Sequence, residues 1–198
     1  MAPLTPGIAR RARRPAATRA VVAFITGVWL ALVARLGAQA VHASEAQVKA
    51  VFLLNFAQFV DWPPATAADS QAPLIIGILG DDPFNGFLDE AVRGERLHAR
   101  PLVVRRYRRL EDVKACDILF ISESEDERVD EILAALKNRP ILTVSDAANF
   151  AQRGGIIRFV TAKSRVRLEI NPDAAQGAHL TLSSKLLRLA DLVTAPGR

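Results

Sequence analysis

Residues 73–84 read Pro73-Leu74-Ile75-Ile76-Gly77-Ile78-Leu79-Gly80-Asp81-Asp82-Pro83-Phe84. The run of Leu and Ile residues is too continuous for a half-exposed strand and too short to span a membrane. It therefore predicts a strand over 74–79 that is buried on both faces. The Gly, the two Asp residues and the Pro that follow predict a turn into a helix. A strand buried on both faces needs helices above and below it, which predicts an α/β layered domain with a mainly parallel sheet.

Outward from this strand, helix and strand signals alternate along the chain. Only residues 161–165 separate the last two predicted strands, too few for a parallel crossover, so this C-terminal pair is predicted to be an antiparallel hairpin. The sequence thus predicts a single layered domain whose central sheet has about six strands and helices on both faces. Further strands are expected at 102–107, 117–121, 141–144, 156–160 and 166–170, and helices at 45–60, 84–92, 124–137, 145–152 and 183–193.

Two capping boxes mark predicted helix starts, Ser44 with Gln47 and Ser124 with Glu127. The helix that begins after Ser44 carries phenylalanines at helical spacing, which we interpret as a core stripe. Other apolar residues spread around most of its circumference. The helix is therefore either sandwiched inside the domain or covers the interface of a homodimer. The run Asp61-Trp62-Pro63-Pro64 ends it.

The net charge of +5 is unevenly placed along the 198 residues. No acidic residue lies in 1–43, and the remainder has 20 basic residues against 21 acidic ones. The high overall pI therefore does not indicate a nucleic-acid partner. The length suits one ordinary core, so we expect one domain over 44–198. The six basic residues of 1–43 are Arg10, Arg11, Arg13, Arg14, Arg19 and Arg35.

Residues 1–43 have the layout of a secretory signal peptide. An arginine-rich segment precedes the apolar run 21–34, and Ala38-Gln39-Ala40 follows as a small-x-small cleavage signature. The apolar run is short for a membrane-spanning helix, so cleavage is favoured over a retained anchor. We expect the mature protein to begin at Val41 or Ser44 and to reside in the periplasm.

Motifs of catalysis and cofactor binding are absent from the sequence. It contains no GxGxxG, Walker A, GxSxG or HExxH pattern, and no pair of histidines at metal-ligand spacing. His98 and His179 are isolated, and isolated histidines are usually structural or solvent-exposed. We expect no catalytic residue, no metal site and no cofactor, and therefore not an enzyme.

Asp81 and Asp82 follow a buried strand at its carboxyl end, where ligands of open α/β sheets bind. A response-regulator receiver has acidic residues here, but the strand at 117–121 continues into Ser122 where a receiver needs its phospho-accepting aspartate. Turn and helix-cap roles are favoured for both aspartates. A small-ligand-binding module at this end of the sheet is the alternative.

Two further features invite a functional interpretation. Arg105-Arg106-Tyr107-Arg108-Arg109 is interpreted as the solvated end of a strand, with an acidic protein surface or lipid head groups as the functional alternative. Cys116 is the one cysteine, so it cannot form an intramolecular disulfide and is expected to be a small core residue.

Several blocks in fixed order resemble the YfiR-like family of periplasmic regulators, and together they span about residues 45–193. The resemblance is carried by Lys49-Ala50-Val51-Phe52-Leu53-Leu54-Asn55-Phe56-Ala57-Gln58-Phe59-Val60-Asp61-Trp62-Pro63, Ile76–Phe84, Cys116–Ser122, Leu142-Thr143-Val144-Ser145-Asp146, Gly154-Gly155-Ile156-Ile157, Glu169-Ile170-Asn171 and Ser183–Ala190.

The resemblance implies a non-catalytic protein that binds the periplasmic domain of an inner-membrane signalling protein. In the type member this partner is a diguanylate cyclase held inactive, so release raises cyclic-di-GMP and favours biofilm growth. The type member also uses disulfides, whose second partners this chain lacks. The partner-binding residues that we expect are Asn55, Phe59, Trp62, Glu169, Ile170 and Asn171.

Overall fold

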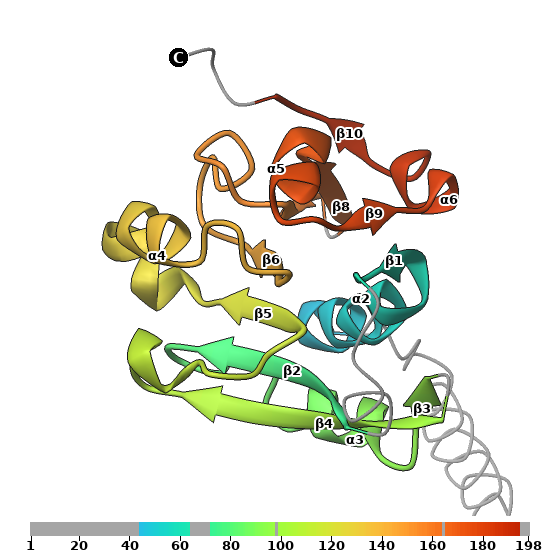
Figure 1. Cartoon of the computed structure of the whole chain (residues 1–198). Coiled ribbons are helices and arrows are strands. Elements are labelled where there is room, and N and C mark those ends of the chain that lie inside the picture. Colours follow the sequence, from blue (N-terminus) through green and yellow to red (C-terminus); the bar gives the residue numbers. More distant parts are fainter. Residues whose placement is uncertain (1–43, 64–71, 98, 164, 195–198) are drawn as a thin grey trace, which may run out of the picture. The chain divides into compact units, whose positions relative to one another are not determined.

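The computed structural model describes residues 44–63, 72–97, 99–163 and 165–194. An eight-stranded sheet has the strand order β10-β8-β7-β6-β5-β2-β4-β3 (Figure 1). Its strands are β2 (Leu74–Leu79), β3 (Arg96–Leu97), β4 (Arg100–Tyr107), β5 (Ile118–Ile121), β6 (Leu142–Ser145), β7 (Ile157–Ala162), β8 (Arg165–Ile170) and β10 (Asp191–Leu192).

The centre of the sheet is parallel, as predicted. Strands β4, β2, β5, β6 and β7 pair in parallel, and β7 and β8 form the predicted antiparallel hairpin. Strands β3 and β10 were not predicted, because a strand of two residues is too short to show a periodicity. The prediction of a mainly parallel α/β sheet is confirmed.

Helices cover both faces of the sheet, and two hydrophobic cores result. Helices α2 (Glu45–Phe59), α3 (Phe87–Val92), α5 (Pro172–Gly177) and α6 (Ser184–Leu187) contribute to the core that contains Ile76, Phe120 and Phe159. Helix α4 (Val129–Ala135) and the turns around it build the second core on Leu119 and Ile121. Residues 119 and 120 face opposite cores because successive side chains of a strand alternate.

Helix α2 begins as predicted, because Ser44 Oγ accepts from Gln47 N and Gln47 Oε1 accepts from Ser44 N. It ends where Val60 turns into β1 (Val60–Asp61), which pairs antiparallel with β9 (Thr181–Leu182). This small second sheet links the start of the domain to its C-terminal part. Within the described residues, no helix is both long and apolar enough to cross a membrane.

Three predicted helices differ from the structure. Ser122, not Ser124, caps a 3-10 helix, η3 (Glu123–Arg128), that precedes α4, because the Ser124 hydroxyl accepts from Asp81 N instead. The predicted helix 145–152 is a series of turns, since Ser145 belongs to β6 and its hydroxyl accepts from Ala147 N. The predicted helix 183–193 shortens to α6, because the chain then extends to pair with β8 as β10.

A short 3-10 turn, η2 (Leu110–Asp112), completes the elements. The predicted signal peptide, residues 1–43, lies outside the described residues.

Candidate functional site

The six predicted partner-binding residues do not form one patch. Ile170 is 0% exposed and packs in the core with α2, and Asn171 is 1% exposed. The Asn171 side chain caps α5, because its Oδ1 accepts from Ala174 N at 3.0 Å and its Nδ2 donates to Ala151 O at 2.8 Å. Both residues therefore have clear structural roles within the domain. The more accessible members are Asn55, Phe59, Trp62 and Glu169, all of them half-buried.

Glu169 pairs with an arginine of its own domain. Its Oε2 accepts from Arg158 Nη1 at 3.1 Å, and Gln152 Nε2 lies 3.4 Å from the same oxygen. Arg158 also donates to Ala147 O, on the side of the sheet that α4 covers. Glu169 and Trp62 consequently lie on opposite faces of the sheet, and a single surface through both is not formed.

Val51, Asn55 and Phe59 lie on one face of α2, because residues four apart are neighbours on a helix surface. Trp62 follows just beyond the helix end, after β1. Val51 is 51% exposed, an unusual exposure for a valine on a helix that otherwise contributes five buried residues. We call Val51, Asn55, Phe59 and Trp62 the α2 stripe. The Phe59 and Trp62 rings also rest against the core.

The carboxyl end of β2, the expected location of a ligand, is closed by the protein itself. Asp82 Oδ1 accepts from Phe84 N at 2.7 Å, and Arg106 Nε donates to Asp82 Oδ2 at 2.8 Å. Gly80 has φ of +89°, and a Cβ added there would lie 2.5 Å from Ser124 Oγ. The turn after β5 is thus packed directly on the turn after β2. Asp82 thus has the turn role that the sequence favoured, but neither aspartate caps α3, whose N-cap residue is Gly86.

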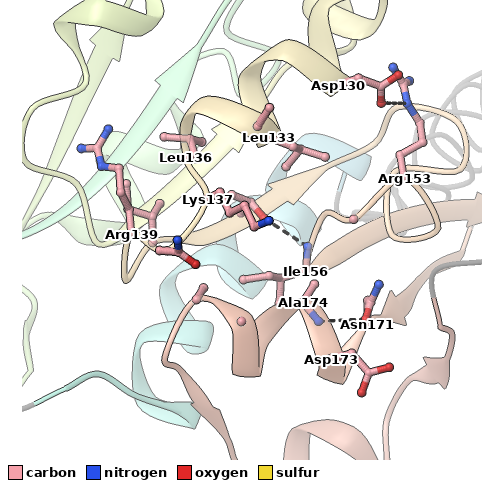
Figure 2. Close-up of a pocket in the computed structure, with 17 residues that line it drawn as sticks. Asp130, Leu133, Leu136, Lys137, Arg139, Arg153, Ile156, Asn171, Asp173 and Ala174 are labelled. Carbon is pink, nitrogen blue, oxygen red and sulfur yellow. Dashed lines mark hydrogen bonds and ion pairs between the residues drawn. The ribbon is translucent and has the colours of Figure 1, made fainter. Parts of the chain in front are cut away.

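A cleft of about 470 Å³ lies at the opposite end of the sheet, between α4 and α5 (Figure 2). Leu133, Ile156 and Ala174 line its middle, with Arg153 and Asp130 at one end and Arg139 at the other. Its volume is within the range of small-molecule sites. Most of its polar groups already have internal partners: Arg153 pairs with Asp126 and Asp130, Arg139 donates to Val113 O and Lys114 O, and Thr143 Oγ1 accepts from Ile156 N.

A buried ion cluster fixes the other end of α2. Lys49 Nζ lies 2.9 Å from Asp146 Oδ2 and 2.6 Å from Glu45 Oε1, and it sits 5.8 Å from the centre of the Phe159 ring. Burial lowers the pKa of Lys49, but the hydrogen bonds to Glu45 and Asp146 outweigh it and the pKa is raised. The amine is therefore protonated at neutral pH, so this cluster anchors α2 and does not supply a nucleophile.

In the part of the chain that the structure describes, no group of three or more His, Cys, Asp or Glu side chains is placed to hold a metal ion.

A family model described as YfiR/HmsC-like matches residues 46–191, nearly the whole domain. The chain belongs to the YfiR/HmsC-like family. Members of this family are periplasmic regulators rather than enzymes. A search of curated proteins found no match. Among solved structures, a conserved domain protein from Vibrio cholerae O1 biovar El Tor strain N16961 matches with 13% identity and a TM-score of 0.48. The match covers 75% of this chain and 60% of that one.

Cys116 packs against the second core from its edge. The Cys116 thiol donates to Ile118 O at 3.0 Å. Its sulfur also packs closely on Gly77, because a Cβ added to that glycine would lie 2.8 Å from the sulfur. Burial raises the pKa of Cys116 to about 12. Because the thiolate is the reactive form, this cysteine is poorly suited to redox chemistry.

The raised pKa predicts an alkaline loss of stability. The unfolded thiol loses its proton near its ordinary value of 9.0, whereas the folded thiol keeps it to about 12. Between these values the unfolded state binds fewer protons, so the free energy of unfolding falls as the pH rises, by up to about 1.4 kcal/mol per pH unit. Urea unfolding at pH 8 and pH 10 should show this fall in the wild type and a smaller one in Cys116→Ala. A difference between the two proteins that is independent of pH would contradict the assignment.

Proposed function

We propose that this protein is an exported regulatory binding protein that controls an inner-membrane signalling protein through its periplasmic part. The observation that carries the proposal is the YfiR/HmsC-like family match, which covers nearly all of the domain. We further propose that the partner is a diguanylate cyclase, so that the output is the level of cyclic-di-GMP and biofilm growth. The signal-peptide layout of residues 1–43 supports export.

The α2 stripe is our candidate for the surface that contacts the partner. An exposed valine and an asparagine on α2, with half-buried aromatic rings at its end and just beyond it, provide apolar surface with a polar group, as interface cores do. Trp62 is the residue most suited to act as the anchor, because tryptophan is enriched among the residues that dominate binding energy. Its ring already packs against the core on one side, so little side-chain entropy remains to be lost on binding.

Replacing Trp62 with Ala should weaken binding to the partner by more than about 1 kcal/mol, or roughly fivefold or more in affinity. Membranes from the source organism supply the partner, and the immobilised periplasmic domain captures it after detergent extraction. In cells that lack the wild-type gene, complementation with Trp62→Ala should fail to restore low cyclic-di-GMP.

Two matched variants separate binding from folding. The Trp62 indole N–H has no hydrogen-bond acceptor among the described residues, so Trp62→Phe should keep both fold and binding. Gln176→Ala changes an exposed residue of α5 and should behave as wild type. If a folded Trp62→Ala protein captured the membrane partner as well as the wild type does, the α2 stripe would not be part of the interface. Unchanged cyclic-di-GMP after deletion of the gene would instead remove the cyclase as partner.

A small-ligand-binding module is the second candidate function. The observation that favours it is the cleft between α4 and α5, not the Asp81–Asp82 end of the sheet where the sequence suggested it. Two lining cations, Lys137 and Arg139, have no ion pair with a carboxylate of the described residues, and Arg139 donates to backbone carbonyls. The two candidates are compatible, since a regulator can carry a ligand site away from its partner surface.

A further inference from the structure

Strand β4 leaves most of its outer side without a neighbouring strand. On its inner side it pairs with β2 over six residues, Leu102 to Tyr107. On its outer side β3 pairs only with Arg100 and Pro101. In the strand order, β4 and the two-residue β3 form one margin of the sheet (Figure 1). From Val103 onward, no strand of the described chain covers this edge.

The direction of the free backbone groups follows from two hydrogen bonds. Leu102 N donates outward to Glu95 O at 3.1 Å, and Tyr107 O accepts on the inner side from Gly80 N at 3.2 Å. Backbone groups of alternate residues in a strand point to opposite edges. The N–H and C=O groups of Val104 and Arg106 therefore point outward. Neither residue makes a backbone hydrogen bond on that side to any part of the chain that the structure describes.

The same edge carries positive charge that its own domain does not neutralise. Arg106 pairs with Asp82 and Asp89, and Arg109 pairs with Glu111 and Asp112. Arg105 and Arg108 are exposed, and no described carboxylate lies within ion-pair distance of either. Exposed arginines on an open edge discourage pairing with a second copy, because the two sets of guanidinium groups would meet. An acidic strand is favoured instead, because its carboxylates would meet guanidinium groups of opposite charge.

We infer that the outer edge of β4 binds an extended acidic segment of another protein, which adds to the sheet as a strand. Its backbone pairs with Val104 and Arg106, and its carboxylates lie beside Arg105 and Arg108. Val104 faces the side of β4 opposite to Arg105, and its half-buried side chain favours apolar residues at the intervening positions of the segment. This surface is separate from the α2 stripe, so the two assignments stand or fall independently.

The test uses a short fluorescein-labelled peptide in which glutamate alternates with valine, and anisotropy titration with the whole periplasmic domain. Three probes are compared: this peptide, its counterpart with lysine for glutamate, and the acidic peptide N-methylated along its backbone. The acidic peptide should bind, and each of the other two should bind about tenfold more weakly or worse. N-methylation removes the strand's donors but leaves its charge, so it distinguishes strand addition from charge attraction.

Protein variants locate the site. Arg105→Glu with Arg108→Glu should reverse the preference, so that the lysine peptide binds better than the acidic one. Val104→Pro removes an outward N–H and spares the pairing with β2, so it should weaken binding about tenfold, whereas Val104→Thr retains the N–H and should not. The peptide comparison decides the matter if Val104→Pro does not fold. Equal binding of the methylated and unmethylated acidic peptides, or binding of anionic phosphatidylglycerol vesicles without peptide binding, would overturn the inference.

Discussion

Replacing Phe159 with Ala should lower the free energy of unfolding by about 3–5 kcal/mol, the range for deleting a buried aromatic ring. Phe159 is 1% exposed on β7, and its ring centroid lies 5.9 Å from that of Phe56 and 6.0 Å from that of Phe52. It also lies 6.5 Å from Phe120 of β5. One ring thus joins α2 to two strands. Urea unfolding followed by circular dichroism measures the loss.

Val160→Ala is the matched control for Phe159→Ala. Val160 is the next residue of the same strand, points to the other face and is half-buried, so its truncation should cost roughly 1 kcal/mol or less. Phe159→Leu should fall between the two, because it keeps much of the buried volume. A loss below about 1 kcal/mol for Phe159→Ala would show that α2 does not depend on this ring.

Lys49→Met should be the second most destabilising change, at about 2–3 kcal/mol. Removing one partner of a buried ion pair leaves the other without compensation, which typically costs about 3–5 kcal/mol. We expect less here because the Asp146 side chain keeps 19% of its surface exposed. Asp146 Oδ1 is already buried without a hydrogen-bond partner among the described residues, so the variant leaves both of its carboxylate oxygens unsatisfied.

A double-mutant cycle isolates the pair. Lys49→Met with Asp146→Leu removes both charges, and it should recover part of the stability that Lys49→Met loses alone. The raised pKa of Lys49 predicts a pH dependence as a second test. The ion pair stabilises the fold fully below the unfolded-state pKa of 10.5, and this stabilisation is lost as the pH rises through the higher folded-state pKa. Additive losses in the cycle would mean that the two side chains do not interact.

The sheet could be predicted from the sequence because its central strands are continuous apolar runs with turn residues between them. The hairpin followed from loop length alone. The prediction of Ser124 as a helix cap was wrong, since its hydroxyl accepts from the N–H of Asp81, which is distant in the sequence. Likewise, the extension of 191–192 depends on a tertiary partner, β8, that no local pattern reveals.

The candidate site was predicted less well than the fold. Residues 169 and 170 adjoin in a strand, so their side chains had to face opposite sides, and alternation alone could have shown that both cannot serve one surface with Trp62. Glu169 and Arg158 are also directly opposed in the β7–β8 register. Their pairing could have been predicted once the hairpin register was known. The open edge of β4 depends on strand order, which the sequence does not encode locally.

The pairing of β1 with β9 has a consequence for the order of folding. Val60 pairs with Leu182, and Phe59 O accepts from Ser183 N at 2.9 Å, so the first helix of the domain is completed by residues near its end. Contacts between such distant segments carry a large loop-closure cost and form late. A chain that is still emerging cannot make them. The domain therefore reaches its native state only after its last quarter is available, so the export that we propose would leave an unfolded chain on the inner side of the membrane.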